Sequence, residues 1–200
     1  MYRIETETSV EDFLIDEDAR DQVGVSRAPR EQLLVQDEGD EMAVGLFVDQ
    51  GALSNLAAND PVRQLGNHNL GDFLLAVEGV SHFVYLMWCA RKDQRLSALE
   101  LELQAEIDKY ATCLLCGTEP TGEERSEQLR RRLFEQFEYH EDLDPQERER
   151  YHIANQNAHR YSASLERRFV KVGRIPAMLE ELRRFYRLPL GGKLDLIRAA

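Results

Sequence analysis

Three residues that can do chemistry interrupt one of the most apolar segments of the chain. Glu78, Ser81 and His82 lie within "AVEGVSHFVYLMW", residues 76–88. An α-helix turns about 100° per residue, so Ser81 and His82 fall about 60° and 40° from Glu78 on a helical wheel. A carboxylate and an imidazole can exchange protons or bind zinc, iron or manganese. The segment therefore predicts a narrow polar stripe along an otherwise apolar helix.

The next predicted helix carries a carboxylate in an unusual position. Glu106 lies at the border of the apolar face of that helix, rather than on its polar side. The short connection at residues 93–95 favours an antiparallel arrangement of the two helices. This geometry places His82 level with Glu106, and Glu78 level with Tyr110, to within about one helical turn. We therefore expect these side chains to meet between the two helices.

A later helix, predicted from "YHIANQNAHRYSASLERRF", residues 151–169, supplies further polar groups. Asn155 stands on a face of small residues that allows close helix contacts, and it needs hydrogen-bond partners if it is buried. His152 and His159 are seven residues apart and lie only about 20° apart on the wheel. The full candidate polar cluster or ligand-binding site consists of Glu78, His82, Glu106, Tyr110, His152, Asn155 and His159.

Three interpretations of this cluster remain open from the sequence. It can be a metal site, with His82 as ligand or general base and Glu106 as ligand or orienting group. It can instead be a dry hydrogen-bond network, or a solvated stripe stabilised by Glu–His pairs four residues apart. The sequence has no HExxH motif and does not repeat the Glu-x-x-His spacing of di-iron bundles. We therefore assign no metal and no cofactor.

Other motifs are weaker. Cys113 and Cys116 have C-x-x-C spacing but end a predicted helix, where the dipole opposes thiolate formation, and no second such pair exists. We interpret them as structural cysteines. "PLGGK", residues 189–193, matches too little of a phosphate-binding loop and is interpreted as a flexible turn. Arginines cluster at 130–132 and 183–184, but the net charge of −12 makes nucleic-acid binding an unfavourable interpretation.

The pattern of the whole chain predicts a mainly α fold, a helical bundle of four to five helices with a small N-terminal β-hairpin packed on it. Two strand-like runs, residues 32–36 and 42–49, flank "DEGD" and predict the hairpin. We expect residues 1–50 to be an acidic N-terminal segment with the hairpin and residues 51–200 to be the bundle, together forming one compact domain. Helices are expected at 51–60, 70–92, 97–116, 123–139, 145–170, 176–186 and 193–198.

Charge is distributed unevenly along the chain. Residues 1–60 contain 4 Lys and Arg against 15 Asp and Glu, whereas residues 121–200 contain 16 against 14. The N-terminus lacks the basic start and apolar centre of a signal peptide, and no run reaches the length of an uncharged membrane span. We therefore expect a cytoplasmic protein without membrane contact.

The expected function is that of a binding or regulatory module for a protein partner or a small ligand. A homodimer formed through the apolar strand at residues 42–48 is a further expectation. One alternative is a metal-dependent enzyme with a Glu/His site between helices, and whether the protein is an enzyme stays open. A second alternative is an acidic mimic that blocks a basic protein.

Overall fold

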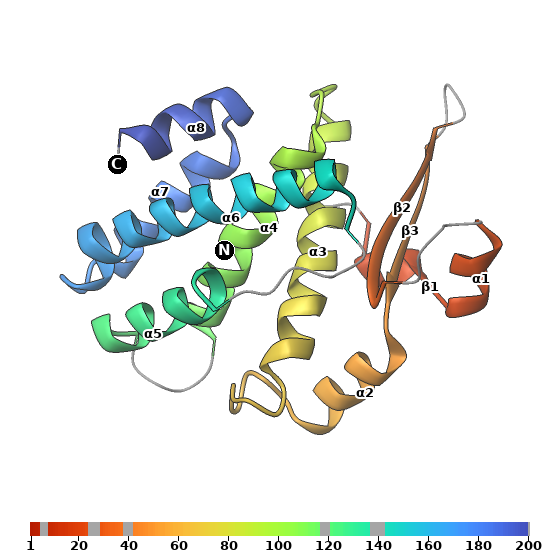
Figure 1. Ribbon diagram of the computed structural model, residues 1–200, viewed down its shortest axis with the longest axis horizontal. Helices are drawn as coiled ribbons and strands as arrows, with labels where there is room; N and C mark the ends of the chain where they lie inside the picture. The colour runs from red at the N-terminus through yellow and green to blue at the C-terminus, as the bar shows by residue number, and fades with distance from the viewer. Residues whose placement is uncertain (5–7, 24–28, 38–41, 117–120, 137–142, 200) are drawn as a thin grey trace. The chain divides into compact units, whose positions relative to one another are not determined.

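The computed structural model describes residues 1–4, 8–23, 29–37, 42–116, 121–136 and 143–199. It is mostly helical, at 66%, with a small mixed sheet of three strands. The chain forms two compact units, which are described separately (Figure 1). The sheet unit comprises Glu5–Gln94 and Cys116–Thr118; the helical unit comprises Met1–Ile4, Arg95–Leu115 and Glu119–Ala200. The expected domain division at residue 50 stays a prediction.

The sheet unit is built around the predicted hairpin. Strands β2 (Glu31–Asp37) and β3 (Met42–Val48) pair antiparallel, with Leu33 opposite Leu46. A third strand, β1 (Leu14–Ile15), pairs parallel to β3, so the order is β1-β3-β2 and β2 forms one edge. The antiparallel pairing of the two predicted runs is confirmed, but they form part of a three-stranded mixed sheet, and the expected turn at residues 38–41 lies outside the described residues.

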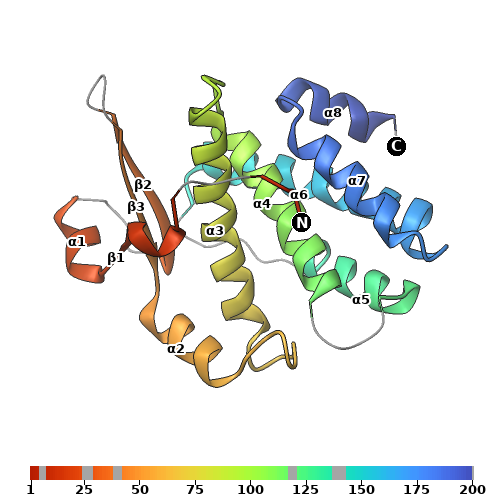
Figure 2. The ribbon, with the colours of Figure 1, turned by 180° about the vertical axis from the view of Figure 1, so that it is seen from behind.

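Helices cover both faces of this sheet. On one side, α3 (Leu70–Ala90) packs on β2 and β3. On the other side, α1 (Glu17–Gln22) places the Arg20 guanidinium 4.3 Å from the centre of the Phe47 ring. Figures 1 and 2 show the sheet between these two helices. Two further elements, the 3₁₀ turn η1 (Val10–Phe13) and α2 (Gln50–Ala58), complete the unit. The core consists of Leu46, Val48 and Phe83, with Val10, Phe13, Leu33, Val44, Leu53, Leu75, Val84 and Met87 packed against it.

Helix α3 begins at its predicted start, Leu70, without a side-chain cap. Asn69 occupies the N-cap position without capping the helix. Its side chain accepts from the Gly66 amide and donates to the carbonyls of Asn59 and Gln64, so it fixes the preceding loop. By length and composition α3 could also cross a membrane, a property that it shares with core helices of soluble proteins. The packing of α3 on β2 and β3 favours the core-helix interpretation.

The helical unit contains α4 (Ala98–Leu115), α5 (Glu123–Phe134), α6 (Pro145–Leu165), α7 (Ile175–Tyr186) and α8 (Leu190–Arg198). Local signals explain the two best-defined helix starts. The Ser97 hydroxyl accepts from the Glu100 amide at 3.2 Å. Asp144 and Glu147 form a complete capping box before α6, with Pro145 in its first turn.

Two features of this unit differ from the predictions. The helix expected to reach residue 170 changes after Leu165 into a π-helix, η2 (Glu166–Val170). The "PLGGK" segment is not a flexible turn, because α8 already begins at Leu190. Pro189 occupies the N-cap position with φ −67°, and Gly191 and Gly192 lie in the first turn of the helix. A mainly helical fold is confirmed; the end of the helix predicted to reach Tyr139 lies outside the described residues.

Candidate functional site

A chain of buried hydroxyls and a carboxylate crosses the interior of the helical unit. Ser126 Oγ, on α5, donates to Glu166 Oε2 at 2.8 Å. Because that bond uses the single hydroxyl proton of Ser126, the 2.7 Å contact between Tyr110 and Ser126 has Tyr110 as donor. Tyr110 and Ser126 are fully buried, and burial raises the pKa of Tyr110 to about 12. Tyr110 therefore acts as a neutral hydrogen-bond donor.

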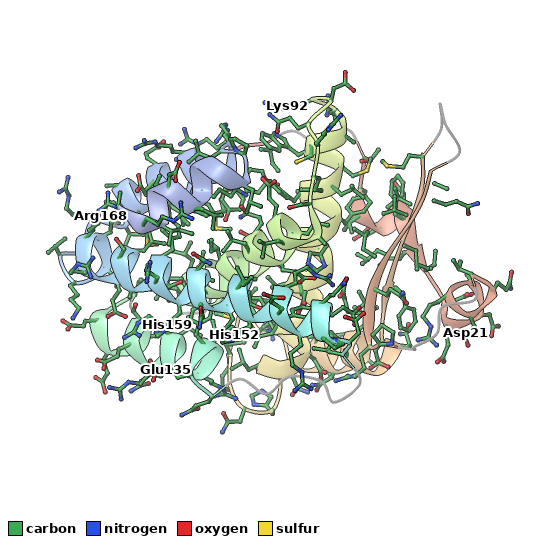
Figure 3. The ribbon with its side chains drawn as sticks, turned by 45° about the horizontal axis from the view of Figure 1, so that its top comes forward. Asp21, Lys92, Glu135, His152, His159 and Arg168 are labelled. Carbon is green, nitrogen blue, oxygen red and sulfur yellow. The ribbon has the colours of Figure 1, made fainter. Side chains whose placement is uncertain are left out.

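The same chain continues to the surface through Arg130 and His159. Arg130 Nη1 lies 2.7 Å from His159 Nε2, and Arg130 Nε lies 3.5 Å from Glu166 Oε2. Glu135 Oε1 is 3.3 Å from both Arg130 Nη1 and His159 Nε2. The Phe134 ring stacks on the imidazole at 5.7 Å. Figure 3 labels His159, on α6, and Glu135, which directly follows α5. Burial, together with the positive charge of Arg130, lowers the pKa of His159.

Two of the predicted site residues, Tyr110 and His159, thus belong to one network of hydrogen bonds and ion pairs. Four members of the network, Ser126, Arg130, Glu135 and Glu166, were not predicted as site residues. The sequence held only an indirect indication of them, because Ser126 is a small residue in a strongly charged helix. The network is suited to holding three helices together, since its innermost groups are closed to solvent.

The other predicted residues of the helical unit lie outside this network. His152 is exposed, and its Nε2 lies 2.8 Å from the side-chain amide nitrogen Nε2 of Gln156 on the next turn. Asn155 is buried, and its Nδ2 has no hydrogen-bond partner among the described residues. Glu106 Oε1 forms a buried ion pair with Lys109 Nζ at 2.6 Å. The structure therefore gives His152 and Glu106 local partners within their own helices.

The predicted polar stripe of α3 has a partner within the sheet unit. His82 Nδ1 lies 3.7 Å from Glu31 Oε1, and both side chains are 10% exposed. Glu31 is the first residue of β2, so this pair joins the helix to the edge strand. Glu78 is half-buried on the same helix. His82 and Glu106 belong to different units, so the predicted facing pair and the metal site built on it stay predictions.

The edge strand of the sheet unit presents backbone groups for pairing. The Asp49 amide donates to the Arg30 carbonyl at 2.7 Å, which identifies the pair 30/49 as hydrogen-bonded. Hydrogen-bonded and non-bonded pairs alternate along an antiparallel ladder, so Gln32 and Leu34 point their backbone groups toward β3. The N–H and C=O groups of Leu33 and Val35 therefore point away from β3, to the open edge.

Ion pairs hold the start of this edge strand in place. Arg30 Nη2 lies 2.9 Å from both Asp49 and Asp72, which belong to the starts of α2 and α3. Asn55 donates to Asp72 Oδ2 at 2.7 Å. The Asn55 hydrogen bond and then Arg30 lower the pKa of Asp72, whose carboxylate is therefore ionised near neutral pH. These ion pairs thus hold the start of β2 against the starts of α2 and α3.

Charge also distinguishes the two units. The sheet unit contains 6 Lys and Arg against 18 Asp and Glu, a net charge of −12. The helical unit contains 19 of each and is neutral overall. Exposed carboxylates of the sheet unit lie on η1 and α1: Glu11, Asp12, Glu17, Asp18 and Asp21. All of the excess negative charge of the chain therefore belongs to the unit with the open strand edge.

Comparisons with known proteins yield no relative on which to base a function. No protein family, no curated protein and no solved structure matches the chain.

Proposed function

We propose that the protein is a binding module whose sheet unit captures an extended, basic segment of a partner protein. The observation that carries the proposal is an open strand edge, β2, in a unit with a net charge of −12. A peptide that adds to this edge would become a fourth strand, with main-chain hydrogen bonds to Leu33 and Val35. Backbone pairing would supply affinity, and the net negative charge of the unit would favour a basic sequence.

The geometry of β2 supports pairing along its length. The strand runs for seven residues, and among the described residues no backbone group outside it bonds to the outward groups of Leu33 and Val35. Val35 is 49% exposed, so a neighbouring strand would bury an apolar side chain. Long exposed edges attract other strands unless charge or proline prevents it. No proline interrupts β2.

Charge argues that the occupant is a different, basic chain rather than a second copy. Two sheet units would each bring a charge of −12 to a shared edge, where paired strands lie about 4.8 Å apart. That spacing is shorter than the Debye length of about 8 Å at physiological ionic strength, so salt would screen the repulsion only in part. A segment rich in Lys and Arg would instead be attracted.

Substitution of Val35 by proline tests the proposal. Because the Val35 N–H points away from β3, Val35→Pro removes an outward donor and obstructs the edge without removing a β2–β3 hydrogen bond. Val35→Thr is the matched control, since it keeps the N–H and the β-branched shape. The probe is a synthetic peptide of alternating Lys and Val, measured by isothermal titration calorimetry.

We expect the unaltered chain and Val35→Thr to bind the peptide, with affinity that falls as salt is raised. Val35→Pro is expected to bind at least roughly tenfold more weakly while its circular dichroism stays unchanged. Equal, salt-sensitive binding by all three chains would reject edge pairing and favour the acidic-mimic alternative. Absence of binding by the unaltered chain would reject both. If sedimentation detects a dimer of the unaltered chain and only a monomer of Val35→Pro, the occupant of the edge is a second copy.

A further inference from the structure

A groove in the helical unit lies between α7 and α8, away from the polar network described above. Its volume is about 440 Å³, within the range of small-ligand sites. One wall comes from α7 and from Leu188, two residues beyond its end. The other comes from α8 and the following Ala199, with a contribution from η2. The described residues that line it are Arg168, Glu181, Arg184, Leu188, Gly192, Asp195, Leu196 and Ala199.

The charges that line the groove are paired with one exception. Arg168 Nη1 lies 3.0 Å from Glu181 Oε1, and Figure 3 labels Arg168 at its place after α6. Asp195 Oδ1 lies 3.1 Å from Arg198 Nη1. Among the described residues, no acceptor lies within hydrogen-bonding distance of the Arg184 guanidinium. The groove therefore has one cation available for an anionic ligand.

We propose that this groove binds a small monocarboxylate with an apolar tail. The carboxylate would accept from Arg184, and the tail would lie against Leu188, Leu196 and Ala199. Because Glu181 and Asp195 already have cationic partners, a single negative charge balances the site. A phosphate dianion would bring more charge than the one available guanidinium neutralises, and would leave the apolar wall without a contact.

Calorimetric titration with simple probes tests this proposal. Sodium hexanoate carries both the carboxylate and the tail; acetate lacks the tail, hexanol lacks the charge, and inorganic phosphate lacks the tail but carries more charge. We expect saturable binding of hexanoate with a Kd on the order of 1 mM, as suits so few heavy atoms. The other three probes are expected to bind more weakly.

Three variants locate the site. Arg184→Gln is expected to weaken hexanoate binding by at least roughly tenfold, the loss typical of a charged hydrogen bond. Tyr161→Phe is expected to leave hexanoate affinity unchanged, since Tyr161 is fully buried and does not line the groove. Arg160→Gln is the control, since Arg160 is an exposed arginine on α6 that does not line the groove.

Equal hexanoate affinity in Arg184→Gln and the unaltered chain would overturn the proposal. So would tighter binding of phosphate than of hexanoate, or no saturation by hexanoate at about ten times the expected Kd.

Discussion

Arg130 Nη1 lies 2.7 Å from His159 Nε2, and this contact fixes the protonation state of the imidazole. Because a guanidinium can only donate, Nε2 must accept, so His159 is neutral and carries its proton on Nδ1. Glu135 Oε1, 3.3 Å from the same nitrogen, would instead favour a proton there. His159 thus has one partner that requires the neutral ring and a second that favours the charged ring.

Stability should consequently fall with acidification in a way that depends on His159. Burial and Arg130 lower its folded-state pKa below the ordinary value of 6.5, while Glu135 and Glu166 oppose part of that shift. As pH falls, the unfolded chain takes up the proton first, so the contribution is complete above pH 6.5 and is lost toward the folded-state pKa. Urea denaturation of His159→Gln between about pH 5 and 7.5 should show a shallower slope than the unaltered chain. His152→Gln, at an exposed position, is the control, and an equal slope in all three chains would contradict the prediction.

A methyl group added at Gly79 should crowd the interface between α3 and the sheet. A Cβ there would lie 3.0 Å from Leu46 Cδ1 and from the Glu31 side chain, and Leu46 is fully buried and cannot easily move. Overpacking typically costs about 1–3 kcal/mol, against about 1 kcal/mol gained in helix propensity. At Gly71, in the same helix, an added Cβ meets nothing within 4 Å. Chemical denaturation should therefore find Gly79→Ala less stable than Gly71→Ala, and the opposite order would disprove the crowding argument.

Lys193 should be far more important for stability than an exposed lysine. Its Nζ is fully buried, donates to Gln104 Oε1 at 2.8 Å and lies 3.8 Å from Glu100. Lys193→Met would leave the buried Glu100 without this cation, at a cost of about 3–5 kcal/mol. Lys171→Met, which removes a surface pair with Glu123, should cost far less, because solvent screens an exposed pair. Similar denaturation midpoints for the two variants would show that the buried carboxylate has other compensation.

The sequence predicted helix starts where the signals are local. Asp144, Pro145 and Glu147 act on one turn of backbone, and α6 begins at Pro145 as expected. The start of α8 was predicted three residues late, because Gly191 and Gly192 resemble a turn in the absence of the packing around Lys193. The π-helix after Leu165 has no sequence pattern that distinguishes it from the α-helix before it.

Site prediction from the sequence had a similar limit. The expected antiparallel pairing selected Tyr110 and the helical wheel selected His159, and both lie in one network of the helical unit. The wheels could not find Ser126 or Glu166, because their partners come from other helices and depend on tertiary packing. The predicted contact between His82 and Glu106 needed the relative placement of two helices, for which the sequence offered only a loop length.

The π-helix leaves the chain after α6 tolerant of a one-residue deletion. Its Lys171 amide donates to the Glu166 carbonyl, five residues back, so this turn contains one residue more than an α-helical turn. Deletion of Arg167 would let the turn close with ordinary α-helical spacing, and the residues after it would keep their register. A one-residue deletion in the middle of α6 would instead rotate the two halves of that helix against each other by about 100°.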